Sequence, residues 1–236
     1  MVDMEPKVTI LIPTRFDNKY LIELALVTIR KYTTIPYKII VGDAGVDKDT
    51  RQFLDAQEDI KVLNCPDPLR PKDTLVRSFD TPFGIILHDD VQIKRQGWLK
   101  ERVDIMHNNP KIGILGVVSA TYIYGWKRFF YRSPLYRRFF PLALMIRKEV
   151  QEELDLRWGK ILGFDTGAIA YMQFLKQKKW KFKKYKFNKD LIHIGGMTWV
   201  VRKVINNEEM LGLDKYLNRR KQMIEVIKWR LERKEY

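Results

Sequence analysis

The chain contains very little cysteine. One cysteine, Cys65, stands among 236 residues, and no second cysteine lies at metal-binding spacing from it. A single thiol forms no disulfide within its own chain, so disulfide-rich secreted scaffolds and cysteine-based zinc sites are excluded. We therefore expect the protein to work in a reducing, cytoplasmic environment.

Long apolar runs are also missing. No segment reaches the roughly 18 uncharged apolar residues that a membrane-spanning helix needs. The first residues include acids and lead directly into a strand-like run, without the basic stretch and apolar core of a signal peptide. We expect a soluble protein, or one that binds at the periphery of a membrane.

Acidic residues are outnumbered by basic ones, with 29 Asp and Glu against 44 Lys and Arg, which gives a formal net charge of +15. Such an excess implies an anionic partner, and the sign of the charge does not choose among nucleic acid, phospholipid and a phosphorylated substrate. Hydrophobic residues still make up 45% of the chain, which is enough to form a core and excludes global disorder.

Short apolar runs alternate with helical patterns through the first half of the chain. Unalternated runs of Val, Ile and Leu that are separated by helices are typical of a parallel sheet covered on both faces. We therefore predict an α/β fold with an open, mostly parallel twisted sheet flanked by helices. The runs cover residues 8–14, 37–43, 60–64, 83–87 and 112–119.

The second half of the chain is less regular. Residues 122–140 interleave aromatic and basic side chains, which suits an anionic membrane interface or an acceptor groove as well as a core covered by long basic side chains. After this stretch we predict a strand at 142–146 and a helix at 164–177. The alternating residues 181–187 indicate an edge strand.

This change of character suggests the domain organisation. We predict one domain over residues 1–212, with a nucleotide-donor half at about 1–118 and an acceptor half at about 119–212. Residues 213–236 have the pattern of a basic amphipathic helix. Such a helix packs on its own domain or docks on a membrane or a partner.

Three aspartates, Asp43, Asp89 and Asp90, follow predicted parallel strands. Ligands of open α/β sheets bind beyond the carboxyl ends of the strands, so we expect these side chains to converge on one crevice. Carboxylate oxygens suit Mn²⁺ or Mg²⁺, and such a cation neutralises a diphosphate leaving group. The structural alternatives are an Asx turn at Asp43 and a solvated loop at Asp89 and Asp90.

The sequence resembles the inverting family-2 glycosyltransferases of the GT-A fold over residues 8–99. The motifs of that family occur here in the same order, and each of them alone is weak. Toward the C-terminus the resemblance is thinner. The matching segments are VTILIPTR (8–15), VGD (41–43), LVRS (75–78), LHDDVQIKRQGWL (87–99), GFD (163–165) and HIGG (193–196).

The resemblance implies a role for each residue that matches a motif. Asp90 and His193 would hold a divalent cation, Mn²⁺ or Mg²⁺. Asp165 would deprotonate the acceptor hydroxyl, because an inverting transfer needs a base opposite the leaving diphosphate. Asp165 is equally suited to cap its helix, and His193 to a structural hydrogen bond. The residues that would contact the nucleotide-sugar donor are Pro13, Thr14, Arg15, Asp43, Arg77 and Asp89, of which Asp89 would bind either the ribose or the metal.

Two positions depart from the family pattern. His88 stands at the first position of the DxD-like box, where Asp is usual, so it softens the negative charge and leaves the metal ligation open. Gly167 stands where a second Asp is expected after Asp165.

The implied function is transfer of a sugar from a nucleoside-diphosphate-sugar to a hydroxyl of a glycan or lipid-linked acceptor, with peripheral contact to an anionic membrane. A sugar-phosphate nucleotidyltransferase is the second enzyme class, weakened because residues 13–19 contain no glycine-rich phosphate loop. A basic nucleic-acid-binding protein is the non-enzymatic alternative. The sequence has no helix-turn-helix, zinc finger or RNP strand, so we expect no specific nucleic acid.

Overall fold

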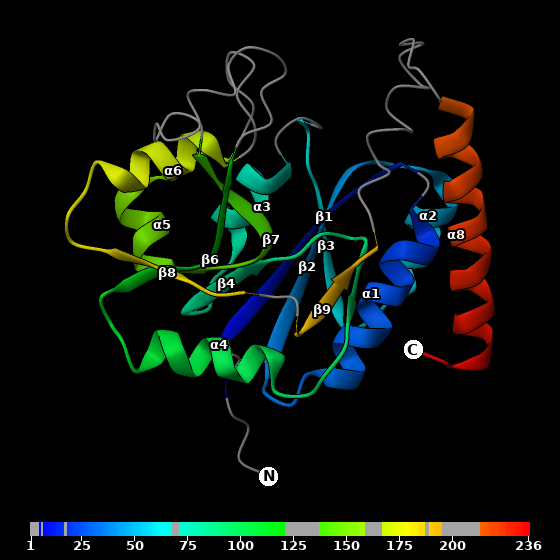
Figure 1. The fold of residues 1–236 in the computed structure, drawn as a ribbon, viewed down its shortest axis with the longest axis horizontal. Coiled ribbons are helices and arrows are strands. Elements are labelled where there is room, and N and C mark those ends of the chain that lie inside the picture. Colours follow the sequence, from blue (N-terminus) through cyan, green and yellow to red (C-terminus); the bar gives the residue numbers. More distant parts are fainter. Residues whose placement is uncertain are drawn as a thin grey trace.

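The computed structural model describes residues 5, 7–16, 18–67, 71–120, 137–158, 167–186, 189–194 and 213–236, with the backbone alone at 119, 120, 137, 138, 141 and 213–216. Strands and helices alternate through the first half, as predicted (Figure 1). The elements are β1 (Val8–Phe16), α1 (Lys19–Tyr32), β2 (Tyr37–Val46), α2 (Lys48–Asp55), β3 (Ile60–Asn64), α3 (Pro71–Ser78), β4 (Phe83–Ile86), β5 (Val91–Ile93), α4 (Trp98–His107), β6 (Ile112–Ala120), β7 (Arg137–Arg147), α5 (Lys148–Leu154), α6 (Ala168–Leu175), β8 (Lys181–Lys184), β9 (Leu191–His193) and α8 (Leu213–Arg233).

The main sheet has the strand order β3-β2-β1-β4-β7-β6-β8. Strands β1 to β4 pair in parallel, and β8 pairs in parallel with β6. Strand β7 is the exception, because it lies antiparallel to both of its neighbours. The prediction of an open, mostly parallel sheet is therefore confirmed.

Both faces of this sheet are covered, which explains the unalternated apolar runs. Along β1, Ile10 and Ile12 face one apolar cluster while Leu11 faces another. This alternation is the two-residue period of a strand, with both sides buried. The first cluster includes residues of α1 and α4, and the second includes residues of α3, α5 and α6.

Helix α8 lies beside α1 (Figure 1). Ile227 of α8 is buried against Leu21 and Leu24 of α1. The predicted basic helix therefore packs on the body of the protein. Val226 and Trp229, on another side of α8, are 52% and 45% exposed.

The predicted elements of the second half are partly confirmed. Strand 142–146 lies inside β7, and the predicted edge strand 181–187 corresponds to the shorter β8, at one edge of the sheet. The predicted helix 164–177 corresponds to α6, which begins only after Gly167. Most of the aromatic and basic stretch 122–140 lies outside the described residues. Among the residues that the structure describes, no helix is both long and apolar enough to cross a membrane.

Gly167 has a structural reason to be glycine. Its φ is +123°, and an added Cβ would lie 2.5 Å from the carbonyl oxygen of Phe139. Its own carbonyl accepts hydrogen bonds from the backbone of Phe139 and of Tyr171, so this residue joins β7 to the start of α6. An aspartate in this conformation would be strained, which accounts for the departure from the family pattern.

Candidate functional site

The site lies where β4 ends and the chain turns into β5. Strand β5 pairs antiparallel with β9 in a separate two-stranded sheet, and Val91 is opposite His193. The backbone N–H of Ile194 donates to the carbonyl of Asp90 at 2.9 Å. This short pairing brings His193 to the DxD-like box although about a hundred residues separate them along the chain.

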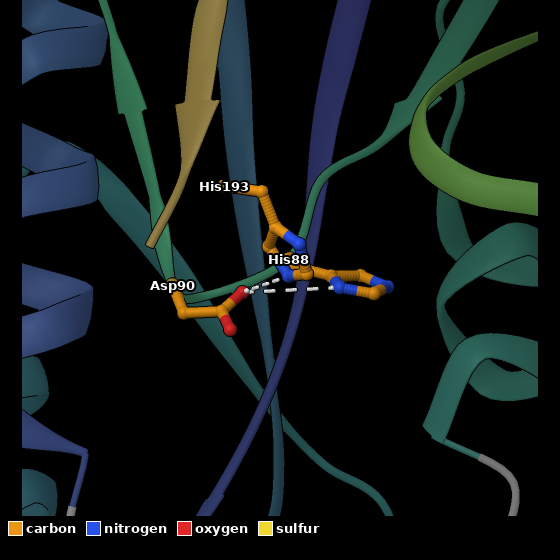
Figure 2. Close-up of side chains that lie close together, drawn as sticks. All are labelled: His88, Asp90 and His193. Carbon is orange, nitrogen blue, oxygen red and sulfur yellow. Dashed lines mark ion pairs between the residues drawn. The ribbon is translucent and has the colours of Figure 1, made fainter. Parts of the chain in front are cut away.

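His88, Asp90 and His193 form one cluster (Figure 2). Nε2 of His193 lies 3.2 Å from Oδ1 of Asp90, and Nδ1 of His88 lies 3.8 Å from the same oxygen. One ligand atom from each of the three residues lies within 4.8 Å of the others. Asp90 is 2% exposed, so its carboxylate is almost wholly enclosed.

This cluster fits a divalent cation. Oδ1 of Asp90 and Nε2 of His193 are buried, and among the described residues they have no hydrogen-bond partner besides this contact with each other. Two ligands at about 2.1 Å from one ion and at right angles to each other lie about 3 Å apart, close to the separation of these two atoms. A His-Asp-His donor set suits Mn²⁺ and other transition ions better than Mg²⁺, which prefers oxygen ligands.

The carboxylate of Asp90 and the imidazoles of the cluster shift each other's pKa values. Burial favours the protonated form of Asp90, yet the neighbouring imidazoles of His193 and His88 outweigh it and lower the pKa of Asp90. The Asp90 carboxylate in turn raises the pKa of His193, against the opposing effect of burial. The carboxylate of Asp90 is thus kept ionised, as a metal ligand must be, whereas His193 would have to lose its proton to bind a cation.

Asp89 has a different environment from its neighbour. Its Oδ2 accepts hydrogen bonds from the Thr14 hydroxyl at 2.7 Å and from the Asn18 amide at 2.8 Å. Burial and the nearby charge of Asp90 raise the pKa of Asp89 to about 6, although both hydrogen bonds act in the opposite direction. Thr14 follows the apolar part of β1 and Asn18 precedes α1, so the first strand-to-helix turn holds this carboxylate.

The C-terminal helix reaches this network. Arg220 of α8 is 7% exposed, and its guanidinium donates to Oδ1 of Asn18 at 3.3 Å. The Asn18 amide therefore accepts from Arg220 with its oxygen and donates to Asp89 with its nitrogen. Only one orientation of the amide satisfies both neighbours. Arg220 thus fixes Asn18, and through it Asp89.

Asp43 lies opposite Thr14, at the last regular pair of β2 with β1 before the register shifts. Its Oδ1 accepts from the backbone N–H groups of Gly45 and Val46 at 2.9 and 3.0 Å, and its Oδ2 pairs with Arg51 at 3.1 Å. The Asx turn that the sequence allowed is therefore present. The side chain is 14% exposed and Arg51 is 43% exposed, so the pair is open to solvent on the arginine side.

The remaining predicted residues are more dispersed. Pro13 pairs with Gly42 in the sheet register, and the Arg15 guanidinium lies 5.8 Å from the ring centre of Phe16. Arg77 forms ion pairs with Asp73 and Asp155, which are not among the predicted site residues. Asp165, the predicted base, lies outside the described residues.

Sequence reasoning missed three participants. His88 was visible only as a departure from the family motif, although a histidine beside two acids is itself a metal-site signal. Asn18 stands four residues after the predicted strand 8–14, where a polar residue is most simply a helix cap. Arg220 carried no signal at all, because its partner is 202 residues away.

Comparisons with known proteins find similar structures but no similar sequence. No family model matches the sequence, and no curated protein matches it. TarS of S. aureus, residues 1–349, is similar in structure with a TM-score of 0.58 and 16% identity, over 86% of this chain and 65% of that one. A second TarS structure gives 0.60 and 14%, over 89% and 42%.

A third similar structure is the mannosyltransferase PcManGT from Pyrobaculum calidifontis, in complex with GDP-Man and Mn²⁺. It gives a TM-score of 0.54 and 17% identity, over 85% of this chain and 61% of that one. TarS 1–349 has also been solved with UDP and with UDP-GlcNAc. The chain therefore has a GT-A-type glycosyltransferase fold, and it spans 42% to 65% of the length of these three structures.

Proposed function

We propose that this protein is a divalent-cation-dependent glycosyltransferase, which moves a sugar from a nucleoside-diphosphate-sugar to an acceptor hydroxyl with inversion at the sugar carbon. The observation that carries this proposal is the cluster of a buried Asp90 with the partly exposed His88 and His193, beside Asp89, at the carboxyl end of β4 in a GT-A-type sheet. The ligands of the similar structures, UDP, UDP-GlcNAc and GDP-Man with Mn²⁺, support the same reading.

The donor would lie over the carboxyl ends of β1, β2 and β4. In open α/β sheets this edge is where nucleotides bind. Pro13, Thr14 and Arg15 lie near the end of β1, and Asp43 lies across from Thr14 with its Asx turn. We propose that Asp43 and Asp89 contact the nucleoside, with Asp89 held in place by Thr14 and Asn18.

Asp90 and His193, together with His88, would hold the cation. When bound, it would supply positive charge to stabilise the diphosphate as it leaves. The protein's own contribution is to keep Asp90 ionised and enclosed, so that its ligand oxygen faces the two imidazoles. Arg77 stays a proposed donor contact, and reaching a diphosphate would require it to leave Asp73 and Asp155.

The acceptor side is proposed from the family resemblance. Asp165 would take the proton of the acceptor hydroxyl, and the acceptor would be a glycan or a lipid-linked sugar. The exposed Val226 and Trp229 of α8 stand among basic side chains such as Arg230 and Arg233, which supports peripheral contact with an anionic membrane on the cytoplasmic side.

Thermal unfolding with a panel of nucleoside diphosphates and nucleotide sugars tests this function, with Mn²⁺, Mg²⁺ or chelator present. A ligand that binds only the folded state raises the unfolding temperature, so we expect one nucleotide to do so in Mn²⁺ and not in chelator. Product analysis should then find the free nucleoside diphosphate. Release of pyrophosphate would instead identify a nucleotidyltransferase, and no shift with any nucleotide would contradict the proposal.

A further inference from the structure

Residues 176–189 form a lysine strip. They contain eight lysines and no acidic residue, against a net charge of +15 for the whole chain. All eight are exposed. They stand at the end of α6, along β8 and in the turns on either side, at positions 176, 178, 179, 181, 183, 184, 186 and 189.

The strip is poorly neutralised by the protein itself. Within the described part of the chain, Lys179 is its one lysine in an ion pair, with Glu153. Protection of the β8 edge against pairing with other chains would explain Lys181, Lys183 and Lys184. It does not explain the lysines in the flanking turns, where there is no open edge, and so many like charges repel one another.

The strip leads toward the candidate site. Strand β8 runs parallel to β6, and both run in the same direction as β1 and β4. Lys189, at the end of the strip, precedes His193 by four residues, which in a strand is about 13 Å. Lys186 and Lys189 also line an open pocket of about 630 Å³, together with Arg95, Glu101, Tyr185 and Asp190.

The apolar side chains that the structure describes in the strip pack against the body of the protein. Phe182 packs on Phe139, with 5.6 Å between the ring centres, and Trp180 is half-buried. Docking on a lipid surface uses exposed apolar side chains that insert between lipids, and the strip offers few. The ammonium of lysine is a compact point charge on a flexible stem, and it does not recognise the shape of one particular anionic group. Such charges suit contact with a chain on which negative charges repeat.

We propose that the lysine strip binds a polyanionic acceptor, a glycan chain carrying repeated anionic groups, and guides its end to the candidate site. This inference rests on the proposed glycosyl transfer, since it names the acceptor of that reaction. It places the acceptor on the β8 side of the molecule, whereas α8 lies on the opposite side (Figure 1).

Two variants with the same change of charge test the inference. In the strip variant Lys178, Lys181, Lys183 and Lys184 become Gln. In the control, exposed basic residues away from the strip become Gln, namely Lys7, Lys61, Arg219 and Lys221. The probe is labelled inorganic polyphosphate, and its Kd is measured by fluorescence anisotropy over a range of salt concentrations. Thermal unfolding checks that both variants are folded.

We expect the strip variant to bind polyphosphate at least about tenfold more weakly at physiological salt, and the control within about twofold of the wild type. The slope of log Kd against log salt should fall by about 3 in the strip variant, because each lost contact removes roughly 0.7. Equal losses in both variants would show attraction by net charge alone and would overturn the inference.

Parallel probes distinguish other anionic partners. Vesicles of anionic lipid are one such probe, and tighter binding of vesicles than of polyphosphate through the strip would overturn the assignment in favour of a membrane. Single-stranded DNA is the other, and tighter binding of DNA through the strip would overturn it in favour of nucleic acid. Nucleotide binding in Mn²⁺ is measured on the same variants and should not change. If the wild type binds polyphosphate through the strip but binds no nucleotide, the proposed glycosyl transfer is contradicted. If it binds nucleotide but the strip variant binds polyphosphate as tightly as the wild type, the acceptor assignment is contradicted.

Discussion

Asp89 and Asp90 are neighbours in the chain, yet two different regions of the molecule hold them. Asp89 lies between β4 and β5 in the chain, and its carboxylate accepts hydrogen bonds from uncharged groups of Thr14 in β1 and Asn18 before α1. Asp90 belongs to the β5 and β9 region, where two imidazoles face it. The pKa of Asp89 is raised and that of Asp90 is lowered.

This difference indicates a division of roles. When the environments of two adjacent carboxyl groups push their pKa values apart, the groups are suited to different tasks. Asp90 keeps a buried oxygen whose contacts in the described structure are with the two imidazoles, as in a set of metal ligands. The oxygen of Asp89 that accepts from Thr14 and Asn18 is already bound, as in a positioned binding residue.

The largest effect should come from Asp90→Ala. Loss of a direct metal ligand should lower Mn²⁺ affinity by more than the roughly 10 to 100-fold that loss of a supporting residue costs. Turnover should be abolished while the protein stays folded. Calorimetric titration with Mn²⁺ measures this directly, and turnover that survives unchanged would show that Asp90 does not hold the metal.

A smaller and separable effect is expected on the Asp89 side. Arg220→Met should weaken nucleotide binding by about tenfold, as loss of a supporting residue does. If Arg220 acts only through Asn18, the double variant with Asn18→Ala should bind no more weakly than Asn18→Ala alone. Arg219→Met, an exposed neighbour on the same helix, is the control. Additive losses in the double variant would mean that Arg220 acts by another route.

His88→Asp should change metal preference more than affinity. An oxygen ligand in place of an imidazole favours Mg²⁺ relative to Mn²⁺, because Mg²⁺ prefers oxygen donors. We expect the ratio of the two Kd values to move by several-fold toward Mg²⁺, with nucleotide binding otherwise retained. A ratio that does not move would remove His88 from the ligand set.

The smallest expected effect is a decrease in the free energy of unfolding in Asp43→Ala. This substitution removes an Asx turn and a partly exposed ion pair with Arg51, which together contribute about 1 kcal/mol. Denaturant unfolding gives this change. If Asp43 also contacts the nucleoside, Arg51→Gln should spare nucleotide affinity and Asp43→Ala should reduce it. Equal effects of both substitutions would assign Asp43 a structural role alone.

The sheet and its first helices could be predicted because buried parallel strands leave continuous apolar runs in the sequence. The positions of Thr14, Asp43 and Asp89 at strand ends followed from the same runs. Strands β5 and β9 could not be predicted in this way, because three residues carry no periodic signal. Their pairing is what brings His193 to Asp90, so the metal cluster depended on the resemblance.

The contact between Arg220 and Asn18 was invisible for a related reason. Local patterns report which face of a helix is apolar, and Ile227 followed this rule. They do not report that one arginine on that helix ends beside a buried amide at the opposite end of the chain. At Gly167 the sequence showed a departure from the family motif but not its reason. The reason is the positive φ of this residue and its close approach to the backbone of Phe139.

The central claim is that Asp90 and the two histidines hold the cation, and that Asp89 does not. Electron paramagnetic resonance of bound Mn²⁺ tests it most directly, with protein carrying ¹⁵N-labelled histidine and with nucleoside diphosphate present. The account predicts nitrogen coupling from histidine that survives Asp89→Asn and is reduced by His193→Ala. Absence of histidine coupling in the wild type, or its loss in Asp89→Asn, would contradict the account.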